Sequence, residues 1–224
     1  MRAVLGFDTS TAATAAAVVM PDGGAVEARD DPVPGQRPAH ADRLLTLIER
    51  VLDQAKIGWE DVERLAVGVG PGGFTGLRIG VATARALAQA RDLTLVAVGS
   101  LDALAAGVSP AEAGEVAAVI DARRGQVYAA TWRGATCTLE PTALDPEALA
   151  KRVGPGTLTV GDGAVRFREV LEGAGAAVPA DDSPSHRILG ANVCRLGAAG
   201  EPTDRDALVP DYRREPDAKP PSQS

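Results

Sequence analysis

A run of glycines that separates an apolar segment from a helical one places the strongest constraint on how this chain can fold. Residues 68–80 read GVGPGGFTGLRIG, and they join a short apolar segment at 65–69 to a helical pattern over about 75–90. Glycine has no Cβ, so such a turn lets one backbone approach another group very closely. The run therefore predicts a strand, a tight turn and a helix, which is the building unit of α/β folds.

Strand and helix patterns alternate through the first hundred residues. Apolar runs at 2–8, 15–20 and 25–29, the last two joined by the turn sequence Pro-Asp-Gly-Gly, predict an antiparallel meander. Helices are predicted at 39–55, at about 75–90 and from Ser100, whose hydroxyl would be the N-cap, and strands at 65–69 and 93–98. This order predicts an α/β fold with a mixed sheet, in which right-handed crossovers join the parallel strands.

The second half of the chain repeats part of this plan. It contains a predicted hairpin at 116–121 and 126–132, a strand at 157–160, and helices at 146–153, near 164–171 and at 188–199. Two copies of one plan, the second abbreviated, indicate a duplication that gives two lobes, each with a mixed sheet and flanking helices. We predict an N-terminal lobe over 1–100, a smaller C-terminal lobe over 101–212 and a disordered tail over 213–224.

Charge and hydropathy narrow the partners and the location of the chain. Its 23 basic and 30 acidic residues give a net charge of −7, which repels phosphate backbones unless the cations are gathered. We therefore expect the isolated chain to bind RNA or DNA only weakly. The longest apolar stretch, near 12–20, is shorter than the ~20 residues of a membrane span, and no signal-peptide pattern opens the sequence. A cytoplasmic location without membrane contact is expected.

Residue types that carry catalysis are scarce. The two histidines, His40 and His186, and the two cysteines, Cys137 and Cys194, are isolated from one another and do not have metal-ligand spacing. The G-x-S-x-G pattern of a serine nucleophile does not occur. We predict no catalytic residue, no metal site and no cofactor.

The turn after the first strand leaves nucleotide binding open. Asp8, Thr9 and Ser10 lie where actin-like and sugar-kinase folds place an acid and hydroxyls beside a metal ion and phosphates. The same residue types also close turns through their own hydrogen bonds. Together with Gly70 and Gly72 of the glycine run, they form a candidate remnant of a phosphate loop.

Two familiar nucleotide motifs do not fit the glycine run. Gly68, Gly70 and Gly73 match G-x-G-x-x-G, but the next strand ends Val-Ala-Val-Gly and offers no acid for a ribose. No Gly-Lys-Ser or Gly-Lys-Thr follows, which excludes a P-loop. A dinucleotide-binding protein is therefore disfavoured.

The two predicted helices of the first lobe suggest an interface. Small residues four apart form a ridge on the helix at 75–90, against which either a partner or the chain's own sheet could pack closely. The apolar arc of the helix at 39–55 is wide for a helix that buries one face, and exposed apolar patches mark interfaces. We predict a partner interface that contains Leu45, Ile48, Leu52, Gly76, Gly80, Ala84 and Ala88.

Two arginines lie at the tip of the predicted hairpin in the second lobe. Arg123 and Arg124 are either simply solvated there or contact an acidic or phosphate-bearing partner through their fork-shaped hydrogen bonds. The sequence does not decide between these roles.

Four segments in register resemble the bacterial TsaB family, also called YeaZ: FDTS at 7–10, GPGGFTGLRIG at 70–80, GSLDALA at 99–105 and DARRGQVY at 121–128. The resemblance spans most of the chain. It implies a duplicated actin-like, RNase H-like (ASKHA) fold and a part in making N6-threonylcarbamoyladenosine at position 37 of tRNA. Gly73 departs from the family, which more often has serine there, and this weakens a phosphate contact.

The resemblance also implies a non-catalytic scaffold. Family members pair with the transferase TsaD through a helical bundle, the ATPase TsaE joins them, and tRNA is bound through the complex. Two metal-binding histidines of TsaD align with Ser100 and Leu104, neither of which can replace them. A homodimer through the same helices is a further expectation. The alternative is an ATP-binding phosphotransferase or glycoprotease-like hydrolase of the same superfamily.

Overall fold

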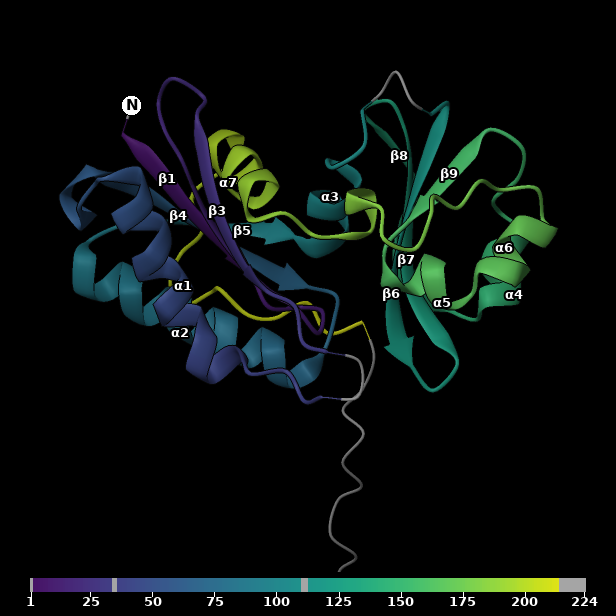
Figure 1. Cartoon of the computed structure of the whole chain (residues 1–224), viewed down its shortest axis with the longest axis horizontal. Coiled ribbons are helices and arrows are strands. Elements are labelled where there is room, and N and C mark those ends of the chain that lie inside the picture. The colour runs from purple at the N-terminus through teal and green to yellow at the C-terminus, as the bar shows by residue number, and fades with distance from the viewer. Residues whose placement is uncertain (1, 34–35, 110–112, 214–224) are drawn as a thin grey trace, which may run out of the picture.

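Two β-sheets with helices packed on them make up the left and right halves of the molecule in Figure 1. The computed structural model describes residues 2–33, 36–109 and 113–213. The strand order is β3-β2-β1-β4-β5 in the first sheet and β8-β7-β6-β9 in the second. Each sheet combines an antiparallel meander with a parallel pair, β1 with β4 and β6 with β9. This arrangement confirms the predicted duplicated α/β fold.

The first sheet has helices on both faces. It contains β1 (Ala3–Asp8), β2 (Thr14–Val19), β3 (Ala25–Asp30), β4 (Val62–Gly70) and β5 (Thr94–Gly99). The helices α1 (His40–Ala55) and α2 (Phe74–Arg91) cover one face, and α7 (Gly190–Ala199) covers the other. The short 3-10 turn η1 (Trp59–Asp61) precedes β4. Alternate β1 residues explain the two layers, because Leu5 and Phe7 pack under α1 and α2 whereas Val4 packs under α7.

The second sheet is smaller. It contains β6 (Glu115–Arg123), β7 (Gln126–Arg133), β8 (Thr136–Leu144) and β9 (Thr157–Val160). The helices beside it are α4 (Pro146–Ala150), α5 (Asp162–Arg166) and α6 (Arg168–Gly173), with the 3-10 turn η2 (Pro184–His186). The strand β8 was not predicted, because Pro141 interrupts its pattern; β8 is an edge strand, where a missing N–H is tolerated. The single helix predicted near 164–171 is two short helices instead.

The end of the chain returns to the first sheet. The helix α7 packs on β1, β2 and β4, and the segment after it continues along the sheet, where Thr203 N donates to Leu95 O and Asp211 N to Val69 O. The predicted boundary near Ser100 separates the two sheets. Residues 190–211, assigned by sequence to the second lobe, nevertheless lie on the first, because an apolar helix face does not specify which sheet it covers. Of the predicted tail over 213–224, only Arg213 lies within the described residues.

One apolar cluster connects the two lobes. It runs from the α7 face of the first sheet through α3 (Ser100–Ala105), where Leu101 and Leu104 are buried, to Ile120 on β6. The lobes therefore share a core on one side, and the turns at the carboxyl ends of β1 and β6 face each other across a cleft on the other. In the described part of the chain, no helix combines the length and the apolar character that a membrane crossing requires.

Candidate functional site

The carboxylate of Asp8 at the end of β1 joins three elements in a closed set of hydrogen bonds. Asp8 Oδ1 accepts from the backbone N and the Oγ of Ser10 at 2.7 and 2.6 Å, and Oδ2 accepts from Ser100 Oγ at 2.6 Å. Gly70 N, at the end of β4, donates to Ser100 Oγ at 3.1 Å. The prediction that Ser100 is the N-cap of α3 was therefore wrong. Gly99 is the N-cap, and the Ser100 hydroxyl connects β1 and β4 instead.

The glycine run packs on the backbone of the β1–β2 turn. Gly73 N donates to Ser10 O at 2.6 Å, and a Cβ on Gly72 would clash with that same carbonyl. A Cβ on Gly76 would clash with Thr9 O. The glycines are therefore needed for a contact within the chain. The residues of the candidate phosphate-loop remnant do come together, but the polar groups of Asp8 and Ser10 are bonded to each other and to their neighbours.

The ridge of small residues on α2 faces inward. Gly80 lies against Thr9, whose Oγ1 donates to Gly76 O at 2.8 Å, and Ala84 and Ala88 pack in the core beneath α2. On α1, Ile48 and Leu52 are also buried, with exposed fractions of 0% and 4%. The predicted partner interface was therefore wrong for six of its seven residues, because the chain's own core covers Ile48, Leu52, Ala84 and Ala88 and its β1–β2 turn covers Gly76 and Gly80.

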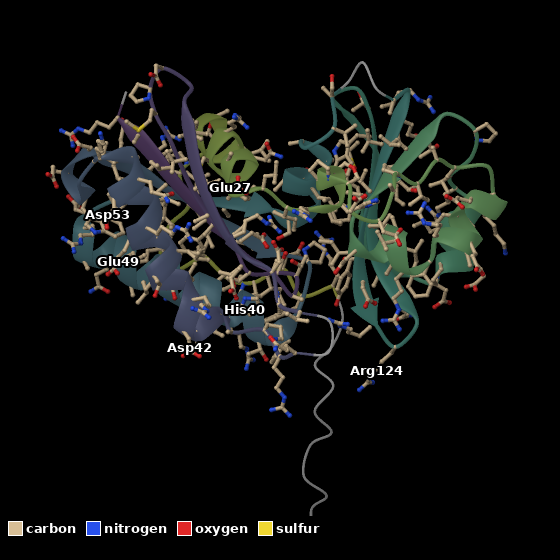
Figure 2. The ribbon with its side chains drawn as sticks, viewed as in Figure 1. Glu27, His40, Asp42, Glu49, Asp53 and Arg124 are labelled. Atoms are coloured by element: carbon tan, nitrogen blue, oxygen red, sulfur yellow. The ribbon has the colours of Figure 1, made fainter. Side chains whose placement is uncertain are left out.

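The outward face of the same two helices carries a different set of residues. Leu45, the remaining member of the predicted interface, is 51% exposed on α1. On α2 the exposed Ala82, Ala86 and Ala90 are also four apart, two positions along from the buried ridge. We missed this second stripe, although the same spacing rule would have found it. Figure 2 shows Asp42, Glu49 and Asp53 along α1, and all three are exposed.

A cleft of about 650 Å³ opens between the lobes beside the glycine run. The first lobe contributes the turn after β1, the start of α1 and the start of α2, and the second lobe contributes the end of β6, the start of β7 and the start of α5. Residues from both sides line it, among them Ser10, His40, Phe74, Asp121, Tyr128 and Asp162.

Two acids on the second-lobe wall of the cleft are held by their neighbours. Asp121 N donates to Asp162 Oδ1 at 3.0 Å, and Asp121 Oδ2 accepts from Arg166 and Arg123 at 2.9 and 3.2 Å. Burial raises the pKa of Asp162, and the charge of Asp121 adds to this shift. This wall therefore carries less negative charge than its two acids suggest.

His40, the first residue of α1, is a structural link between α1, β2 and α2. Its Nδ1 is 2.7 Å from Thr14 Oγ1, its ring lies against Gly76, and it is 5% exposed. Burial lowers the pKa of His40, while the carboxylates of Asp8 and Asp30 oppose the shift. The neutral ring that results serves packing at the cleft wall.

Other groups that could support catalysis are dispersed. His186 accepts from Gly161 N at 3.0 Å, at the start of α5. Both cysteines are free thiols, and burial raises the pKa of Cys137 and of Cys194, which disfavours the reactive thiolate. Within residues 2–33, 36–109 and 113–213, no three histidine, cysteine or acidic side chains gather to hold a metal ion.

Two mixed sheets of matching topology, with their first turns facing one cleft, define the class of this protein as two-lobed and actin-like. The structure of YeaZ from Pseudomonas aeruginosa superposes with a TM-score of 0.78 at 28% identity and covers 95% of this chain and 100% of its own. The ROK hexokinase of Thermus thermophilus, at 13% identity and a TM-score of 0.53, shares the fold alone.

Sequence comparison gives the family. Residues 35–152 match the family model described as "TsaD: tRNA N6-adenosine threonylcarbamoyltransferase". The tRNA threonylcarbamoyladenosine biosynthesis protein TsaB of Bacillus subtilis is 29% identical over 78% of this chain and 80% of its own length. An uncharacterized Mycobacterium leprae protein is 32% identical over 98% of this chain, which spans 57% of that relative's length. The chain therefore belongs to the TsaB (YeaZ) family and carries the domain that the TsaD model describes, which confirms the resemblance.

The inward ridge predicts that Gly80→Leu destabilises the fold. The new side chain must displace Thr9 from its contact with α2, and overpacking of this kind costs about 1–3 kcal/mol in the free energy of unfolding. Denaturant unfolding monitored by circular dichroism measures this loss. The control is Ala82→Leu on the outward face, which should change stability by no more than about 0.5 kcal/mol. Equal midpoints for the two variants would contradict the inward packing.

The burial of His40 predicts a pH-dependent stability. Because its pKa is lower in the folded chain, the unfolded chain binds more protons once the pH falls below the ordinary histidine value of about 6.5. The free energy of unfolding should be fully present above that value and decrease below it. Urea midpoints at about pH 7.5 and about pH 5.5 measure the decrease. It should be smaller in His40→Gln, and an equal decrease in this variant would show that other groups cause it.

Proposed function

We propose that this chain is a non-catalytic scaffold subunit in the synthesis of N6-threonylcarbamoyladenosine on tRNA, where it supports a TsaD-type transferase together with a TsaE-type ATPase. The name of the Bacillus subtilis relative supports the pathway. The observation that carries the scaffold role is the combination of an uncharged outward stripe on α2 with a nucleotide-type turn whose polar groups are bonded within the chain.

The docking surface is the outward face of α1 and α2. We define it by the exposed Leu45, Ala82, Ala86 and Ala90, with the half-buried Ile79, Thr83 and Leu87 beside them. Small side chains let the backbone of a partner helix approach closely, and Leu45 adds apolar area to the contact. This surface lies on the same two helices as the interface predicted from the sequence, but Leu45 is the only residue that the two have in common.

The absence of a catalytic role is supported by the two positions that align with the TsaD histidines. Ser100 is 0% exposed, and its hydroxyl is bonded to Asp8 and Gly70. Leu104 is 1% exposed within the apolar cluster that connects the lobes. An apolar, fully packed position does not supply a ligand to a catalytic metal, so the chemistry would belong to the partner.

The cleft between the lobes is the observation that favours a second candidate function, that of an ATP-binding phosphotransferase or glycoprotease-like hydrolase. The scaffold role predicts that isothermal titration of the isolated chain with Mg-ATP gives no sub-millimolar binding, because Asp8 is held by Ser10 and Ser100 and is not free for a metal ion. Sub-millimolar binding that Asp8→Asn abolishes would favour the enzyme instead.

The docking surface predicts that Ala86→Arg and Leu45→Arg each abolish pairing with the TsaD-type transferase. On α2 the guanidinium would be desolvated at the centre of the contact, and at either position the longer side chain would hold the partner helix away from the surface. Co-purification and the threonylcarbamoyladenosine content of bulk tRNA provide the readouts. Ala135→Arg, at the exposed β7–β8 turn of the other lobe, is the matched control and should pair normally. Pairing of Ala86→Arg at the control level would refute this surface.

The same surface is proposed to form a homodimer when the transferase is absent, since an uncovered apolar helix face tends to pair with its own copy. Light scattering should then give twice the monomer mass for the free chain and the monomer mass for Ala86→Arg. A dimer that persists in Ala86→Arg would place self-pairing elsewhere.

A further inference from the structure

We infer that the mouth of the cleft between the two lobes binds a single-stranded segment of RNA. The inference goes beyond the scaffold role, because it gives this chain a direct contact with nucleic acid; it rests on the proposed function only for the source of that RNA, a tRNA. We call the residues concerned the cleft rim, and they are Arg37, Phe74, Arg78, Arg123 and Tyr212.

Planar side chains in contact with one another form one side of the cleft rim. The rings of Phe74 and Tyr212 lie 5.0 Å apart at 34°, and the Arg78 guanidinium lies 3.7 Å from the centre of the Phe74 ring. Arg78 Nε also donates to Tyr212 Oη at 3.1 Å. Tyr212 stays 42% exposed where it lines the cleft. Aromatic and guanidinium planes of this kind are what unpaired bases stack on.

Guanidinium groups come to the cleft rim from both lobes. Arg37 is exposed on the first lobe, and no ion pair of it occurs among the described residues. Arg123 reaches the cleft from the second lobe with a side chain that is 67% exposed. Two cations on opposite walls can bind successive phosphates of one strand, and guanidinium suits phosphate because it offers paired donors.

Two of the four described acids that line the cleft, Asp121 and Asp211, are paired with arginines. Asp121 accepts from Arg123 and Arg166, and Asp211 accepts from Arg213 at 2.8 Å. Burial favours the neutral form of Asp162 by raising its pKa. Arginines thus gather around the mouth and offset its acids, although the net charge of the whole chain is −7. They are Arg37, Arg78, Arg123, Arg166 and Arg213.

A nucleotide fits the cleft rim less well. A nucleoside triphosphate needs a free acid for its metal ion and free amides for its phosphates, but Asp8 is held by Ser10 and Ser100, and Gly73 N is bonded to Ser10 O. Aromatic and arginine side chains are also enriched at protein interfaces, so a protein partner is the alternative that the experiment below separates from RNA.

The test compares the RNA affinity of the wild-type chain with that of its variants, each in the assembled complex with the transferase and the ATPase. Fluorescence anisotropy with an anticodon stem-loop RNA measures this affinity over a range of salt concentrations. Arg37→Ala should weaken binding and lower the slope of log affinity against log salt by about 1, as the loss of one phosphate contact requires. Tyr212→Ala should weaken binding at least about fivefold through lost stacking. Arg152→Ala, exposed beyond α4 in the second lobe, is the matched control and should change neither value.

A second measurement uses the isolated chain and does not depend on the complex. A single-stranded RNA that carries 4-thiouridine should cross-link at low salt to the peptide containing Tyr212, and Arg37→Ala should reduce the yield. If the wild-type chain does not pair with the transferase, the proposed function is refuted. The cross-link still tests the RNA inference in that case, because it needs only the isolated chain.

Several results would overturn the inference. In the affinity measurement, these are an unchanged RNA affinity and salt slope in both cleft-rim variants, or a loss of RNA affinity in Arg152→Ala that equals theirs. In the cross-linking measurement, it is a set of cross-links confined to other peptides. Two further results are displacement of the RNA by Mg-ATP, and cleft-rim variants that lose ATPase binding while RNA binding stays intact. The last two would assign the cleft to a nucleotide or to a protein partner.

Discussion

The contact between the β1–β2 turn and the first half of α2 determines most of the structure around the site. Thr9 and Ser10 lie directly against Gly72, Gly76 and Gly80, so the helix axis comes closer to the sheet than any larger residue would allow. The Asp8 carboxylate fixes the turn from the other side through Ser10 and Ser100. With α2 held in this way, its outward face and that of α1 have a defined relative position.

This use of the turn links the fold to the proposed function. In the class of two-lobed actin-like proteins, an acid and hydroxyls after the first strand can serve a nucleotide and its metal ion. Here the same groups are bonded to one another, so they stabilise the helices that carry the docking surface. The cleft remains, but its mouth presents arginine and aromatic side chains. We therefore propose a scaffold whose two helices bind a protein and whose cleft contacts the RNA on which that protein acts.

The sequence predicted the elements and the family better than it predicted the sides of the helices. A spacing of four shows that Gly76, Gly80, Ala84 and Ala88 share a face, yet Ala82, Ala86 and Ala90 follow the same rule two positions along. The polar residues Arg78, Arg85 and Gln89 lie beside Ala82 at helical spacing and mark that side as the outward one, a signal that the spacing of the small residues alone does not contain. The role of Ser100 and the return of α7 to the first sheet depend on contacts between distant segments, which periodicity does not encode.

The central claim, that α2 packs inward through one small-residue stripe and binds its partner through the other, is tested most directly by thiol labelling. In a chain whose native cysteines are replaced, Ala86→Cys should react rapidly when free and become protected when the transferase is added, whereas Ala84→Cys should react slowly in both states. Rapid labelling of Ala84→Cys in the free chain, or no protection of Ala86→Cys in the complex, would contradict the account.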